Sequence, residues 1–168
     1  MATPRNSRTP PALPIDAPER RRLPPLLRRA WHGLNQALRR RIAHLDITPD
    51  QFIVMRNLLE GDPSGLTQRE LTHVMTSDPN TVASLLRRME AAGLIARQPH
   101  EQDKRAHRIR LQSAGRRRYD AARHFAVALQ SEVLSVLPED RREEFLVHLD
   151  LVAGACRGAV ERSPRRSQ

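Results

Sequence analysis

Two closely spaced helix starts constrain this 168-residue chain more than any other feature of its sequence. Residues 67–70 read Thr-Gln-Arg-Glu, a capping box in which hydroxyl and carboxylate satisfy each other's backbone N–H groups. Asp78 is a second N-cap, with Pro79 at the first helical position, and Gly93 is typical of the residue just past a helix end. A short helix, a brief turn and a longer helix have the spacing of a helix-turn-helix.

The second of these helices is expected to have two chemically different faces. At 100° per residue its apolar side chains gather on one side, namely Val82, Leu85, Leu86 and Met89. The other side carries groups that suit base edges and phosphates, and we predict five DNA-binding residues there: Asn80, Thr81, Ser84, Arg87 and Arg88. For an isolated amphipathic helix a merely solvated outer face is the better interpretation, so the neighbouring elements decide between the two.

A basic hairpin is expected directly after this helix. Residues 93–98 and 107–112 each alternate apolar and polar side chains, which is the period of a half-buried strand. The segment from Ser77 to Arg118 holds ten basic and four acidic residues, a local balance of +6. A helix-turn-helix followed by a basic two-stranded hairpin is a winged helix-turn-helix, and its concentrated positive charge favours a nucleic-acid partner.

Long helices are expected on both sides of the winged unit. Apolar residues recur at three- and four-residue steps in residues 26–45, 119–136 and 145–160. Thr48 and Pro49 begin a further helix that leads into the winged unit. Together the outer helices would leave apolar surface uncovered in a single chain, so we predict a homodimer built from them.

The expected fold class is mainly α, with four segments. Residues 1–24 hold six of the thirteen prolines and are expected to form a disordered basic arm. Residues 25–160 form one domain, with the winged helix-turn-helix at about 47–112 and dimerisation helices at about 26–45 and 113–160. Residues 161–168 are expected to be a flexible tail.

Other classes of protein find little support in the sequence. There is no apolar signal segment and no run long enough to span a bilayer, so we expect a cytoplasmic protein without a membrane partner. The net charge of +10 and the absence of nucleophile, phosphate-loop or zinc-protease motifs argue against an enzyme. The seven histidines include no i, i+4 pair, and we predict neither a metal site nor a cofactor.

Residues 66–116 resemble the signature region of the MarR (multiple antibiotic resistance regulator) family. The resemblance includes the turn glycine Gly93, the pair Asp103-x-Arg105 in the wing and the Gly-Arg sequence at 115–116. Leu111-Gln112 stands where the family usually has Leu-Thr, and Ser113 is expected to cap the following helix instead.

The resemblance implies a DNA-binding role for the wing. It places the guanidinium of Arg105 in the minor groove, aimed by the carboxylate of Asp103, with Lys104 and Arg108 also in contact with DNA. A narrow A·T-rich minor groove concentrates negative potential, and arginine is the side chain most readily inserted there. The alternative is an ordinary surface Asp–Arg pair.

The resemblance also implies a regulator that is released from DNA by a small molecule. We predict a repressor that binds a pseudo-palindromic operator and responds to an aromatic carboxylate or phenol. Four residues are candidates for the ligand crevice, namely Trp31, His32, Asn35 and Met55. Cys156 lies on an apolar stripe and is expected to be buried and unreactive. The alternative function is a winged-helix protein-interaction module without an operator.

Overall fold

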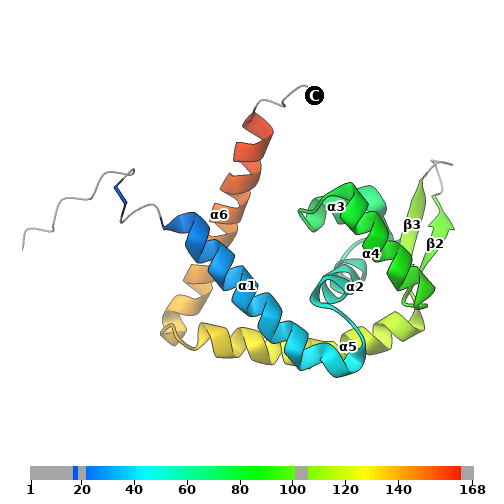
Figure 1. Cartoon of the computed structure of the whole chain (residues 1–168), viewed down its shortest axis with the longest axis horizontal. Coiled ribbons are helices and arrows are strands. Elements are labelled where there is room, and N and C mark those ends of the chain that lie inside the picture. Colours follow the sequence, from blue (N-terminus) through cyan, green and yellow to red (C-terminus); the bar gives the residue numbers. More distant parts are fainter. Residues whose placement is uncertain (1–16, 19–21, 101–105, 164–168) are drawn as a thin grey trace, which may run out of the picture.

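The structure, a computed structural model, describes residues 17–18, 22–100 and 106–163. Three long helices form one end of the molecule: α1 (Leu23–Ile42), α5 (Ser113–Leu134) and α6 (Arg142–Arg162). The shorter helices and the strands lie at the other end of α5, as Figure 1 shows. They are α2 (Pro49–Glu60), β1 (Leu66–Thr67), α3 (Gln68–Val74), α4 (Pro79–Ala91), β2 (Ile95–Pro99) and β3 (His107–Leu111). This arrangement confirms the mainly α, winged helix-turn-helix fold.

Side-chain caps begin the helices of the winged region, by which we mean residues 49–111. Thr48 and Thr67 each accept a hydrogen bond from the backbone N–H three residues later, completing capping boxes at α2 and α3. The side chain of Asp78 caps α4 by accepting hydrogen bonds from the backbone N–H groups of Asn80 and Thr81, without a capping box. Each of these caps lies where the sequence predicts it, because capping depends on residues within one turn of the helix start.

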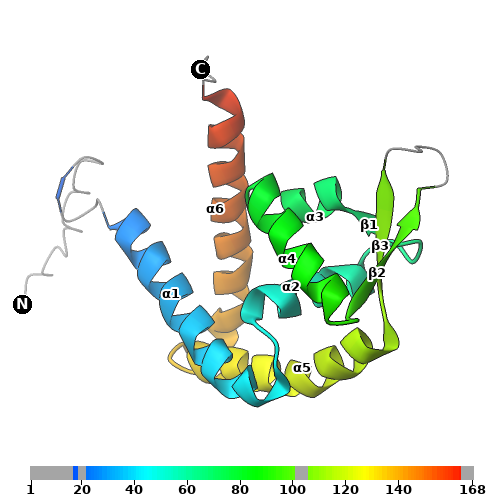
Figure 2. The same ribbon diagram turned by 45° about the vertical axis from the view of Figure 1, so that its right-hand side comes forward.

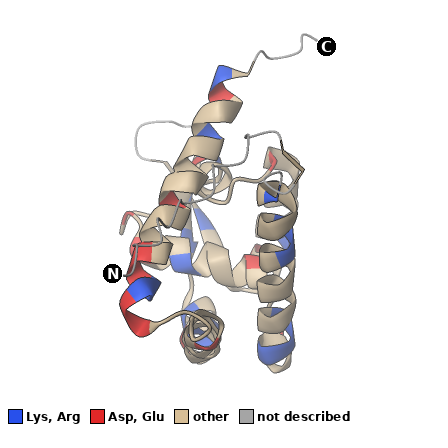
Figure 3. Cartoon of the chain, turned by 90° about the vertical axis from the view of Figure 1, so that its left-hand side faces the viewer, with Lys and Arg blue, Asp and Glu red and all other residues tan. Residues whose placement is uncertain are grey.

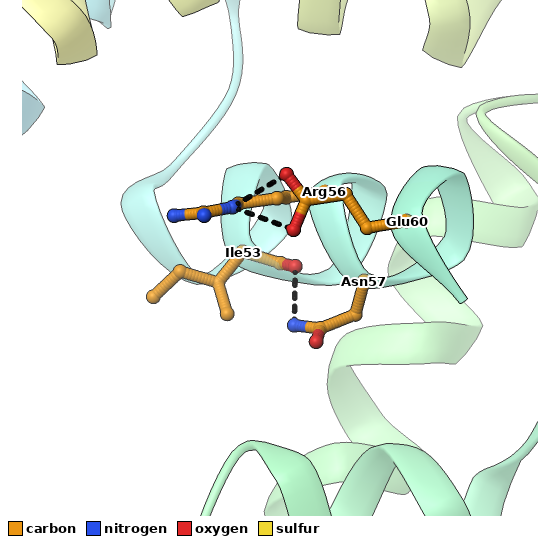
Figure 4. Close-up of polar contacts among 4 residues, drawn as sticks. All are labelled: Ile53, Arg56, Asn57 and Glu60. Atoms are coloured by element: carbon orange, nitrogen blue, oxygen red, sulfur yellow. Dashed lines mark hydrogen bonds and ion pairs between the residues drawn. The ribbon is translucent and has the colours of Figure 1, made fainter. Parts of the chain in front are cut away.

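Helix α2 has a buried face and a charged face. Phe52, Val54 and Met55 are buried in the core. On the exposed face Arg56 Nε donates to both carboxylate oxygens of Glu60, at 2.9 and 3.0 Å (Figure 4). Asn57 Nδ2 donates to the carbonyl of Ile53 at 2.9 Å, as Figure 4 also shows. Such i, i+4 pairs contribute only about 0.2–0.5 kcal/mol each, so burial of the apolar face is what fixes α2 in place.

The strands form a three-stranded antiparallel sheet in the order β1-β3-β2. Ile95 pairs with Leu111 and Pro99 with His107, which makes the predicted hairpin. Strand β1 was not predicted from the sequence. In it Leu66 pairs with Ile109 and Thr67 with Arg108. This strand attaches the wing to the residue that caps α3.

One hydrophobic core joins the winged region to α5 and the end of α1. It contains the apolar face predicted for α4, with Val82, Leu85, Leu86 and Met89 all buried. Phe52 stacks on Tyr119 of α5, with ring centroids 5.2 Å apart. The winged region is therefore packed against α5 (Figure 2).

The outer helices depart from the expectations in three details. Helix α1 begins at Leu23, so Pro24 lies in its first turn and the helix extends into the segment assigned to the arm. Ser113 does not cap α5: Gln112 is the N-cap residue, and it makes no side-chain capping bond. Cys156 is exposed in the single chain and not buried, because no residue of α6 is buried.

Candidate nucleic-acid interface

The candidate interface is built around α4, whose first turn is held by Asp78. One carboxylate oxygen of Asp78 accepts hydrogen bonds from the backbone N–H groups of Asn80 at 3.0 Å and Thr81 at 2.9 Å. Hydrogen bonds from the side chain and backbone of Thr81 are the main causes that lower the pKa of Asp78. Thr81 therefore supports the helix start, in addition to any contact it makes with DNA.

The predicted contact residues of α4 face away from the core. Asn80, Thr81, Arg87 and Arg88 are exposed, and Ser84 is half-buried. Among the residues that the structure describes, Arg87 and Arg88 make no ion pair. The face thus offers an amide, hydroxyls and two guanidinium groups to a partner. These groups suit base edges and phosphates in a major groove, into which an α-helix fits.

The wing supplies a second set of predicted contacts. Its tip, with Asp103, Lys104 and Arg105, lies outside the described residues, so the roles assigned to these three stay predictions. At the base of the wing Arg97 Nε donates to Glu90 Oε2 at 3.0 Å and ties β2 to α4. Arg108 is half-buried, and its Nη1 donates to the carbonyl of Gly65 at 2.9 Å. Arg108 therefore has a contact within the protein that the sequence analysis did not foresee.

A cavity of about 630 Å³ between α3 and the wing extends the interface, and the sequence analysis missed it. Its lining residues are Thr67, Gln68, Arg69, Thr72, Pro79, Arg97, His100, Ala106, His107 and Ile109. Four of these side chains are arginine or histidine, which gives the cavity a basic character suited to phosphate oxygens. The sequence predicts part of its lining, because the capping box at Thr67 places Gln68 and Arg69 in the first turn of α3.

The predicted ligand residues differ in how deeply they are buried in the single chain. Trp31 and His32 are exposed on α1, whereas Met55 is completely buried in the core. Asn35 is half-buried, and its Oδ1 atom is buried without a hydrogen-bond partner among the described residues. Neither the cavity beside α3 nor a second one lined by His73, Val74, Thr76 and Arg157 contains any of the four. The ligand crevice stays a prediction.

The described residues contain neither a metal-ligand cluster nor a helix that could span a membrane. Within residues 22–100 and 106–163, no group of three or more His, Cys, Asp or Glu side chains is arranged to hold a metal ion. No helix of the described chain is long and apolar enough to cross a membrane.

Comparison with known proteins relates this geometry to known function. The sequence profile of the MarR family matches residues 45–106. The transcriptional regulator HosA of Escherichia coli O127:H6 is 30% identical over 126 residues, covering 72% of this chain and 92% of HosA. The structure of an S. aureus MepR–DNA complex superposes with a TM-score of 0.71 at 26% identity, covering 77% of this chain and 95% of MepR. A mutant of E. coli MarR complexed with operator DNA superposes with a TM-score of 0.71 at 25% identity, covering 80% and 95% of the two chains.

Proposed function

The chain belongs to the MarR family of DNA-binding transcriptional regulators, and we propose that it is a homodimeric repressor of a pseudo-palindromic operator, released by a small ligand. Its relatives are transcriptional regulators and not enzymes. The observation that carries the proposal is the outward face of α4, where Asn80, Arg87 and Arg88 are exposed opposite a fully packed core.

The proposed DNA contacts fall into two chemical groups. Asn80 and Ser84 read base edges in the major groove, whereas Arg87, Arg88 and the basic cavity beside α3 hold phosphates. Lys104 and Arg105 at the wing tip would add contacts in or beside the minor groove, with Asp103 aiming Arg105.

Uncovered apolar side chains support the homodimer. Leu26, Trp31 and Leu34 on α1 are exposed, as are Phe145 and Leu149 on α6. Apolar surface of this extent, spread over two long helices, is typical of an interface. A two-fold axis through the terminal helices would place two α4 helices on one side of the dimer, as successive half-sites of DNA require.

A small ligand is the least constrained part of the proposal. The exposed ring of Trp31, the neighbouring His32 and the unpartnered Oδ1 of Asn35 offer an aromatic surface and polar groups on α1. An aromatic carboxylate or phenol suits such a set, and a second chain would have to complete the crevice. Met55 is too deeply buried to reach such a ligand without a change in the core.

Binding to DNA fragments from around its own gene tests the proposal. We expect one fragment to bind much more tightly than random DNA, with an affinity that falls by roughly 10³–10⁵ between 50 and 200 mM salt if six to ten phosphates are contacted. Weak binding of equal strength to every fragment, or no binding, would favour the alternative, a winged-helix protein-interaction module. Sedimentation tests the dimer, and a thermal-shift screen of aromatic carboxylates and phenols tests the ligand.

A further inference from the structure

Two arginines of β3 hold the loop that precedes α3. Arg108 Nη1 donates to the carbonyl of Gly65 at 2.9 Å, and Arg110 Nε donates to the carbonyl of Ser64 at 2.8 Å. Both arginines are half-buried. The donors and acceptors are more than forty residues apart in sequence, so these bonds join separate elements of the fold.

The loop itself is shaped to meet β3 closely. The carboxylate of Asp62 accepts a hydrogen bond from the backbone N–H of Ser64 at 2.7 Å, and the N–H of Gly65 donates to the Asp62 carbonyl at 2.8 Å. Gly65 has a φ of +96°, and a Cβ atom there would lie 2.6 Å from the carbonyl oxygen of Ile109. Only glycine fits this position, because both the backbone angle and the approach to β3 exclude a side chain.

Charge reinforces the contact between loop and strand. Hydrogen bonds from Ser64 are the largest cause that lowers the pKa of Asp62, and the positive charges of Arg108 and Arg110 lower it further. An ionised Asp62 therefore lies near both guanidinium groups at neutral pH.

The loop leads directly into the DNA-binding elements. One residue after Gly65 begins β1, which pairs with β3, and Thr67 at its end is the N-cap of α3. The hairpin is thus fixed to the start of α3 by two backbone pairs and two arginine–carbonyl bonds. Arg97, which bonds to Glu90, fixes the other strand of the hairpin to α4.

We propose that Arg108 and Arg110 are positioning residues: they set the angle of the wing relative to α3 through Ser64 and Gly65, and so determine the preference for the DNA flanking each half-site. This inference rests on the proposed DNA-binding function and replaces the predicted DNA contact of Arg108 with an indirect role. The predicted DNA contact of Arg108 rests on its positive charge and its place near the wing tip, and both features are also expected of a residue that holds the wing.

Salt dependence and flank preference together test the inference. We would compare the parent with Arg108→Met and Arg110→Met, which keep a long apolar stem and remove the guanidinium. Operator affinity should fall roughly tenfold, the effect of losing one hydrogen bond made by a charged group. The salt slope should stay unchanged, and the preference for A·T-rich over G·C-rich flanks should disappear. Arg88→Ala is the matched control, for which the slope should fall by about 0.9.

A double-mutant cycle with Arg105→Ala measures whether the two substitutions affect operator affinity independently. A general loss of stability would not by itself produce coupling between them. If Arg108 acts by aiming the wing, Arg105→Ala should cost little further affinity in the Arg108→Met background. Additive losses, a fall in the Arg108→Met slope of about 0.9, or an intact flank preference in both variants would each overturn the inference. A parent protein with no operator preference would instead overturn the proposed function. Thermal unfolding of each variant confirms that it is folded, and Arg110→Met decides the matter should Arg108→Met not fold.

Discussion

The winged region and the terminal helices differ sharply in how completely they bury their apolar side chains. From α2 to β3 most large apolar residues lie in one core, and Met55, Leu71, Leu86 and Ile109 are completely buried, while Val74 is exposed. In α6 no residue is buried, and in α1 only Ile42 is. Figure 3 shows how charge is distributed over the terminal helices: basic residues lie along α1, while acidic residues gather where α5 turns into α6.

This difference indicates that the winged region is stabilised within one chain, whereas the terminal helices need a surface from outside the chain to cover their apolar faces. The winged region has what a folded unit needs within one chain, namely a closed core and capped helices. The terminal helices have apolar faces that a single chain leaves in water, at a cost of about 25 cal/mol for each Å². A second copy of the chain would cover them, which couples DNA binding by two α4 helices to the terminal helices.

The largest expected effect comes from placing a charge on the apolar face of α6. In Leu149→Glu a carboxylate would be buried without a partner in the dimer, at a cost of about 3 kcal/mol or more. We expect a monomer by sedimentation and loss of tight operator binding, while circular dichroism shows an intact winged region. Leu151→Glu is the matched control: it lies on another side of α6 and is 65% exposed, and it should stay dimeric. A dimeric Leu149→Glu protein would place the interface elsewhere.

A cavity introduced into the core of the winged region should destabilise the fold of the single chain and not the dimer. Leu86 is completely buried on α4, so Leu86→Ala should reduce the free energy of unfolding by about 2–5 kcal/mol. The shift in the denaturation midpoint should be similar across protein concentrations, because the loss lies within one chain. If the loss of unfolding free energy depended on protein concentration, the winged region would not be stable without a second chain, and the two regions would not differ as their burial indicates.

Changes on the outer face of α4 should alter DNA recognition and leave both regions folded. Asn80→Ala or Ser84→Ala should reduce discrimination between operator and variant sites by about 1–3 kcal/mol, because a base contact is lost. Arg88→Ala should weaken all sequences alike and flatten the salt slope by roughly one unit. Dimer mass should not change. Equal losses on operator and random DNA for all three variants would contradict the assignment.

The smallest expected effect is a pH dependence confined to the start of α3. Hydrogen bonds from the backbone and side chain of Thr67 lower the pKa of Glu70 below its ordinary value of 4.5. Because the folded pKa is depressed, this stabilisation is present above about pH 4.5 and is lost as the pH falls through the folded pKa. Glu70→Gln should therefore be less sensitive to acid than the parent in unfolding experiments at pH 6 and pH 3.5.

Thr67→Ala provides the comparison at neutral pH. It removes the hydroxyl of the same capping box and should cost about 1 kcal/mol. Neither variant should change dimer mass, since α3 lies outside the terminal helices. A loss of dimer in either variant would show that the two regions are more tightly coupled than their packing indicates.

The parts of the fold that the sequence predicts are those with local causes. Asp78 and the two capping threonines act within one helical turn, and Leu85 and Leu86 lie on a face set by helical period. The two-residue strand β1 was missed because it exists through its pairing with β3, forty residues away in sequence. Its residues carry no alternation long enough to indicate a strand.

The candidate site likewise has residues whose placement the sequence predicts and contacts that it does not. The exposure of Asn80 and Arg88 follows from the position of each residue on α4. The bond between Arg108 and Gly65 depends on the path of a loop that no periodicity describes. Cys156 was expected to be buried because its helix is amphipathic, but no residue of α6 is buried in the single chain.

Gly115 makes α5 a lever between the two regions. A Cβ atom on Gly115 would lie 2.3 Å from the carbonyl oxygen of Leu94, so the start of α5 rests directly on the backbone of the wing. From Gly115 the helix continues to Leu134, about 30 Å farther along at 1.5 Å per residue. A tilt of about 10° at this contact would move the far end by roughly 5 Å, close to the 5.4 Å pitch of an α-helix. In the proposed dimer, small rotations among the terminal helices would therefore alter the distance between the two α4 helices.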